Sequence, residues 1–140
     1  MQHHEHCSTM WQATLLPTFR STIVQKLLVL VLVRDALMGA LFRILVRLAG
    51  REPVFPAPGE APTTAVGRLR PRLVIVECDH EAAGSDAFYA RLAEVGSRLL
   101  LFSSSPPSRL AEAVAARRGV RAFLLPGERN AIIRSISEAV

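Results

Sequence analysis

Apolar residues along this chain alternate between short continuous runs and more widely spaced stripes. The runs "LLVLVLV" (27–33) and "LVIV" (73–76) are rich in β-branched residues, as expected of strands covered on both faces. Between them the apolar spacing becomes helical, and a helix ended by Gly50 is predicted to direct one stripe inward. That stripe consists of Leu37, Leu41, Leu45 and Leu48, widened by Met38 and Phe42.

The same alternation continues to the end of the chain. Further strands are predicted at 53–56, 98–102 and 122–125. Helices are predicted at 60–69, from Ser85 to Gly96, in 103–119 with Gly119 as the stop, and at 128–140. The last three have apolar faces that we expect to point inward: Phe88, Leu92 and Val95 in the first of them, Leu110 and Val114 in the second, and Ile132, Ile133, Ile136 and Val140 in the third. Serine caps, prolines in a first turn and terminal glycines mark the helix ends.

Five strand–helix units in series predict a parallel, doubly wound α/β sheet with helices on both faces. Ligands of such sheets bind at the carboxyl ends of the strands. Arg34–Asp35, Glu77–Cys78–Asp79 and Ser103–Ser104 follow three of the predicted strands. The sequence therefore predicts one crevice that these residues share.

Length and cysteine content indicate one domain in a reducing compartment. A chain of 140 residues has room for one ordinary core, and we expect a poorly ordered leader at 1–25 followed by a single domain at 26–140. The two cysteines, Cys7 and Cys78, are too few for a disulfide framework and are typical of free thiols. We therefore predict a cytoplasmic protein.

Charge and hydropathy disfavour two classes of function. The net charge of +5 is spread over many arginines, and neither a basic block nor a recognition motif indicates nucleic-acid binding. The most hydrophobic stretch is interrupted by charged residues well before it reaches the ~20 apolar residues that a membrane span needs. These residues are Arg34, Asp35, Arg43 and Arg47. A secretory signal is also disfavoured, because no small-residue cleavage pattern follows the apolar run, whereas attachment to a membrane surface is left open.

Several reactive side chains follow the strand at 73–76. Cys78, Asp79, His80 and Glu81 could suggest a zinc site, but four consecutive residues of an extended chain cannot all face one ion. A Cys78 nucleophile with His80 as base lacks an orienting third group and oxyanion-hole glycines. Loop polarity is the favoured interpretation of the cluster. The leader residues His3, His4, His6 and Cys7 favour adventitious metal uptake.

The order of these motifs resembles that of a response-regulator receiver domain over residues 27–140. "LVLVRDALMGALFRIL" is similar to the first receiver strand, its acidic pair and its helix. "VFPAPGEAPTTAVGRLRPRLVIVE" is similar to the stretch from the second strand to the phosphoacceptor, "LLLFSSS" to the strand before the switch hydroxyl, and "GVRAFLLPGERNAIIRSI" to the last strand and helix. The resemblance implies a flavodoxin-like sheet with strand order 2-1-3-4-5.

Carried over position by position, the resemblance implies a degenerate site. The acidic pair that holds Mg²⁺ in receivers is represented by Arg34 and Asp35, and the phosphoacceptor position by Glu77. The switch residues correspond to Ser103 and Phe123, and Asp79 stands where receivers offer a backbone carbonyl to the metal, which leaves Asp35 and Asp79 as the candidate metal ligands. The family's lysine before proline is missing, since Leu125 leads directly into Pro126–Gly127.

Those departures remove most of what phosphoryl transfer needs. The reaction depends on positioning and on cations around the phosphoryl oxygens. Glutamate moves the carboxylate by about 1.5 Å, and a misplacement near ~1 Å can cost about a hundredfold in rate. We expect little or no phosphorylation and no cofactor, with Mg²⁺ doubtful. We also expect the Arg34 guanidinium to form a bidentate pair with Glu77 and to lock the crevice.

The function implied by the resemblance is that of a non-enzymatic pseudo-receiver in two-component signal transduction that works by protein–protein interaction. The receiver family uses the surface of the last two helices and the fifth strand for dimers and output, and here that surface carries Arg117, Arg118, Arg121 and Arg129. An acidic protein partner is expected, and a homodimer is compatible. Two alternatives stay open: the regulatory portion of a helix-turn-helix transcriptional regulator, and a receiver still phosphorylated in a phosphorelay on Asp79 or Glu77.

Overall fold

A computed structural model describes residues 28–104, 112–113, 116–117, 122–125 and 127–139. Its strands are β1 (Leu28–Leu32), β2 (Glu52–Val54), β3 (Leu73–Glu77), β4 (Arg98–Ser103) and β5 (Ala122–Leu124). Its helices are α2 (Ala36–Leu48), α3 (Pro62–Leu69), the 3₁₀ turn η1 (Glu81–Gly84), α4 (Asp86–Val95) and α6 (Arg129–Glu138). The predicted leader at 1–25 and the predicted inward positions Leu110 and Val114 lie outside the described residues.

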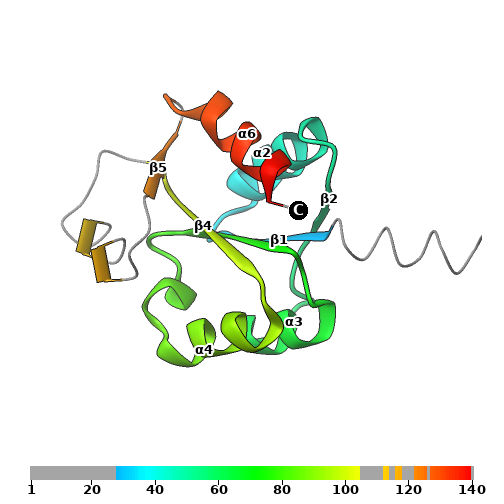
Figure 1. The fold of residues 1–140 in the computed structure, drawn as a ribbon, viewed down its shortest axis with the longest axis vertical. Coiled ribbons are helices and arrows are strands. Elements are labelled where there is room, and N and C mark those ends of the chain that lie inside the picture. The colour runs from blue at the N-terminus through cyan, green and yellow to red at the C-terminus, as the bar shows by residue number, and fades with distance from the viewer. Residues whose placement is uncertain (1–27, 105–111, 114–115, 118–121, 126, 140) are drawn as a thin grey trace, which may run out of the picture.

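The strands form one parallel sheet in the order β2-β1-β3-β4-β5. This confirms the predicted five-stranded, doubly wound sheet of the flavodoxin-like type. Figure 1 shows α2 and α6 on one side of the sheet and α3 and α4 on the other. Because every strand runs in the same direction, the carboxyl ends of β1, β3 and β4 lie together at one edge.

Two apolar cores hold the layers together, one on each face of the sheet. Side chains alternate along β1, so that Val29 and Val31 enter the core beneath α2 and α6, while Leu30 and Leu32 enter the core beneath α3 and α4. This two-sided burial explains why the first run has no polar positions.

The buried face of α2 differs from the predicted stripe. The buried residues are Gly39, Phe42, Leu45 and Val46. Leu37 is 77% exposed and Leu48 is 67% exposed, so placing them inward was wrong. α2 carries large apolar residues around most of its circumference, and spacing alone could not select the face that the sheet covers.

Local sequence features set the helix ends. Asp35, which was not predicted as a cap, begins α2, because its carboxylate accepts a hydrogen bond from the Met38 amide at 2.8 Å, whereas Ser85 and Gly96 mark the ends of α4 as predicted. The Ser85 hydroxyl accepts a hydrogen bond from the Phe88 amide at 3.2 Å, and Gly96 ends α4 in the left-handed conformation at φ 79°.

The last helix agrees with its predicted pattern where it is described. Ile132 and Ile136 are buried and Ile133 packs against the same core. Val140 lies outside the described residues.

Candidate functional site

The crevice at the carboxyl edge of the sheet is built around Glu77, the last residue of β3. Glu77 is 6% exposed, and its register partner on β4 is Phe102. Its Oε1 accepts a hydrogen bond from the Arg34 backbone amide at 3.1 Å, and its Oε2 accepts one from the Ser104 hydroxyl at 3.3 Å. Residues that follow β1, β3 and β4 therefore meet at this carboxylate, as the strand order predicts.

The expected lock between the Arg34 guanidinium and Glu77 is not formed. Arg34 is exposed, and none of the ion pairs among the described residues joins it to Glu77. The two residues are joined instead through the Arg34 backbone amide. The chain leaves β1 at this point, so its free N–H reaches the neighbouring strand end while the long side chain remains in solvent. The sequence-based prediction considered only the Arg34 side chain and not the direction of its backbone N–H.

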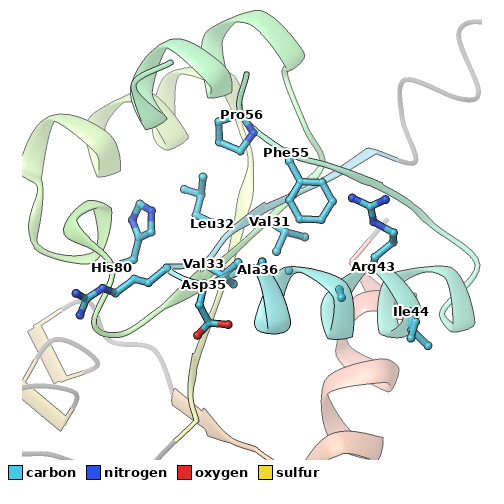
Figure 2. Close-up of a pocket in the computed structure, with 13 residues that line it drawn as sticks. Val31, Leu32, Val33, Asp35, Ala36, Arg43, Ile44, Phe55, Pro56 and His80 are labelled. Atoms are coloured by element: carbon cyan, nitrogen blue, oxygen red, sulfur yellow. The ribbon is translucent and has the colours of Figure 1, made fainter. Parts of the chain in front are cut away.

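The acid that remains of the predicted pair has a structural role. The Asp35 carboxylate caps α2, and Figure 2 shows it pointing away from His80. Asp79 is exposed. Within the described ranges, His, Cys, Asp and Glu side chains do not converge in groups of three that could hold a metal. Because Asp35 is engaged as a cap and Asp79 does not converge with it and Glu77, the described residues do not fit a Mg²⁺ site.

The Ser104 hydroxyl contacts Glu77, and the resemblance had implied the neighbouring Ser103 as the switch residue. Ser103 is buried at the end of β4, and its carbonyl accepts the Leu125 amide at 2.9 Å. In a run of three serines no feature of the sequence distinguishes the two positions. Phe123, the predicted aromatic switch position, is partly buried, lies opposite Phe102 on β4 and packs against the core beneath α2 and α6.

Cys78 does not have the properties of a nucleophile. The side chain is 4% exposed, and burial, followed by the charges of Asp79 and Glu77, raises the pKa of its thiol to about 11. A thiol with that pKa is protonated near neutral pH and is a poor attacking group.

His80 serves as a cap. Its Nδ1 accepts a hydrogen bond from the Ala82 amide at 3.0 Å at the start of η1. Burial, assisted by the Arg34 charge, lowers the pKa of His80 against the opposing effects of Glu81 and Glu77. A neutral imidazole is the form that this hydrogen bond requires, because a protonated Nδ1 could not accept it.

The predicted arginine surface is described only in part. Arg118 and Arg121 lie outside the described residues. Arg117 is exposed, with its Nη2 3.6 Å from an Asp86 carboxylate oxygen of α4, and Arg129 is exposed at the start of α6. The positive charge of Arg117 is thus partly balanced by Asp86 of the same chain.

A second exposed surface lies on α2 and was missed by the sequence-based assignment. Leu37, Ile44 and Leu48 lie on its outer side, and we call them the α2 outer stripe. These three are the large exposed apolar side chains among the described residues, and Ile44 is 57% exposed. Arg43 and Arg47 are exposed on the same helix, which contains no acidic residue. The spacing was visible in the sequence but was assigned to the core.

Within the described part of the chain, each helix is too short or too polar to cross a lipid bilayer.

Comparison with known proteins supports the fold. No protein-family model matches the chain, and no curated protein matches it significantly. Among solved structures, the chain is similar to the crystal structure of a Burkholderia pseudomallei protein described as pilus assembly-related. The two share 24% sequence identity at a TM-score of 0.56, over 82% of this chain and 90% of that one. At this identity the likeness shows a common fold.

Proposed function

We propose that this chain is a receiver-like domain that has lost phosphoryl transfer and acts by binding another protein. The observation that carries the proposal is the state of Glu77, whose two carboxylate oxygens are held by the Arg34 amide and the Ser104 hydroxyl. A phosphoacceptor needs an oxygen free to attack and cations around the incoming phosphoryl group. Here an arginine occupies one position of the metal-binding pair, and the other, Asp35, caps a helix.

The α2 outer stripe supports a binding role and suggests where the partner docks. Contiguous large apolar side chains on the surface of a soluble domain mark interaction sites. Arg43 and Arg47 beside the stripe favour a partner with acidic residues next to its own apolar contacts. We therefore propose that the main contact is on α2 rather than on the arginine surface of the last two helices.

The fold and the thiol are consistent with this role in the cytoplasm. The structurally similar Burkholderia pseudomallei protein is described as related to pilus assembly, which fits a domain that works by contacts with other proteins. Cys78 is a free, buried thiol, as is common in reducing compartments. The proposal includes no enzymatic activity for the domain.

The loss of phosphorylation can be tested directly. The purified protein is incubated with acetyl phosphate and Mg²⁺, in parallel with an active receiver, and both are run on a phosphate-affinity gel. The active receiver shifts and this chain does not. A Mg²⁺ titration followed by amide NMR gives a second readout. A shifted band, or saturable changes at Glu77 and Ser104, would contradict the proposal.

The docking surface can be tested with matched charge substitutions. Ile44→Glu places a carboxylate in the α2 outer stripe, whereas Arg129→Glu changes an exposed residue of α6. After in-cell cross-linking, wild type and Arg129→Glu should retain the same cross-linked partner bands, and Ile44→Glu should lose them. Loss with Arg129→Glu and retention with Ile44→Glu would transfer the contact to the last helix.

A further inference from the structure

A groove runs beside α2 at the carboxyl end of β1, and we call it the α2 groove. Its volume is about 810 Å³. Figure 2 shows α2 on one side, Phe55 and Pro56 on the other, and Val31 and Val33 between them. It borders the Glu77 crevice at Arg34 and Asp35, and it shares Arg43 and Ile44 with the surface proposed above for the protein partner.

Small residues on α2 create the depth of the groove. Ala36, Gly39 and Ala40 line it where most helices carry larger side chains. A Cβ on Gly39 would lie 3.7 Å from the Phe55 ring and 3.7 Å from a Val33 methyl, so even one methyl group would contact the opposite wall. The lining is mainly apolar, and 810 Å³ is within the range of roughly 300–1,000 Å³ that is typical of small-molecule sites.

One end of the groove carries a positive charge. The Arg43 guanidinium carbon lies 4.9 Å from the centroid of the Phe55 ring, a cation–π distance. Arg43 is exposed and takes part in none of the ion pairs found among the described residues. Its charge is therefore available to an anion at the Phe55 end.

The other end is unsuited to negative charge. There the groove adjoins a second hollow, which shares Val33, Arg34 and His80 with it and adds Asp79 and Glu81. Three carboxylates, Asp35, Asp79 and Glu81, outnumber the single Arg34 guanidinium here, so this end carries a net negative charge and disfavours an anion. The charges thus favour one orientation of a bound ligand, with its anionic group at the Phe55 end and its uncharged part towards His80.

We propose that the α2 groove binds a small apolar anion, a compound with an aromatic or aliphatic body and a single carboxylate, sulfonate or phosphate group. The anionic group pairs with Arg43. The body lies against Val33 and Ala40, since Val31 and Gly39 are buried at the floor of the groove. The ring of Phe55 offers a flat apolar wall, so planar ligand bodies fit best.

The test uses the fluorescent probe 1-anilinonaphthalene-8-sulfonate and its uncharged counterpart N-phenyl-1-naphthylamine. The sulfonate should bind the folded protein one to one. Arg43→Gln should weaken its binding about fivefold, the effect of losing one charge-assisted contact at a partly exposed site. Arg47→Gln is the matched control, one helical turn away and outside the groove, and should change the affinity less than about twofold. The uncharged probe should bind equally to wild type and Arg43→Gln.

Two more variants separate the groove from the rest of the surface. Ala40→Phe fills the groove from an exposed helix position and should abolish sulfonate binding, with the fold checked by circular dichroism. Leu48→Ser removes an exposed leucine of the α2 outer stripe and should leave binding intact. Equal weakening by Arg43→Gln and Arg47→Gln, unchanged binding in Ala40→Phe, or loss in Leu48→Ser would overturn the proposal. Any of these results would leave the phosphorylation test above unaffected.

Discussion

Glu77 shows how a buried carboxylate is compensated without a metal. A charge removed from water must be hydrogen-bonded or paired, and here a backbone amide and a serine hydroxyl supply the donors. Neither donor is cationic. The strand ends thus supply two of the hydrogen bonds that this carboxylate needs.

At Cys78 the structure predicts slow chemical modification. In a Cys7→Ser background, where Cys78 is the remaining thiol, a thiol reagent such as 5,5′-dithiobis(2-nitrobenzoate) should react slowly at pH 8. A pKa of about 11 leaves about one thiol in a thousand ionised at that pH, and the side chain is also buried. Denaturation in urea should raise the rate about a hundredfold or more. Equal rates for folded and unfolded protein would contradict the burial of this thiol.

Glu60 gives the protein an acid-sensitive contact. The Arg68 guanidinium donates two hydrogen bonds to the Glu60 carboxylate, at 2.7 and 2.8 Å, and the Ala57 amide donates a third at 2.9 Å. The bond from Arg68, followed by that from Ala57, lowers the pKa of Glu60 from 4.5 to about 2. Because the folded state holds this proton less tightly than the unfolded state, the contact stabilises the fold above about pH 4.5 and is lost as the pH falls towards 2.

Glu60→Gln should therefore lower the midpoint of urea unfolding at pH 7, and the difference from wild type should narrow as the pH falls below about 4.5. Glu94→Gln is the control, since the exposed Arg91–Glu94 pair is 3.6 Å apart and surface pairs of this kind contribute little. A difference for Glu60→Gln that does not change with pH would show that the effect does not arise from the charge.

At the scale of the element, the face that α2 turns towards the sheet can be tested by mutation. Leu45 and Leu48 are both leucines of the same helix, yet one is buried and the other 67% exposed. Leu45→Ala should cost about 2–5 kcal/mol of unfolding free energy, because it leaves a cavity. Leu48→Ala should change it by less than about 0.5 kcal/mol. Urea unfolding of both variants distinguishes this orientation from the reverse, in which Leu48 would carry the larger cost.

The strands and helix ends could be predicted because each has a local physical cause. A continuous β-branched run identifies β1 and β3. Ser85 acts on an amide next to it and Gly96 sets its own dihedral angles at the ends of α4. The face of α2 and the donors to Glu77 could not be predicted in the same way. Both depend on how separate segments meet in space, which neither apolar spacing nor a family pattern specifies.

At the scale of the molecule, the sheet separates two cores that should respond independently to mutation. Ile136 belongs to the core beneath α2 and α6, and Leu92 to the core beneath α3 and α4. Ile136→Val should cost about 0.5–1.5 kcal/mol and Leu92→Ala about 2–5 kcal/mol. In the double variant the costs should add to within about 0.5 kcal/mol. A larger deviation in urea unfolding would mean that the sheet transmits strain from one face to the other.

The contact between the end of α2 and the end of α6 bears on how the chain folds as it is synthesised. The Arg51 guanidinium donates to the Ser137 carbonyl at 2.6 Å, and the Ser137 hydroxyl donates to the Ala49 carbonyl at 3.2 Å. These partners are 86 and 88 positions apart. A nascent chain on the ribosome must therefore leave the part of α2 that meets α6 uncovered until residue 137 has emerged, and during that interval this apolar surface is open to chaperones.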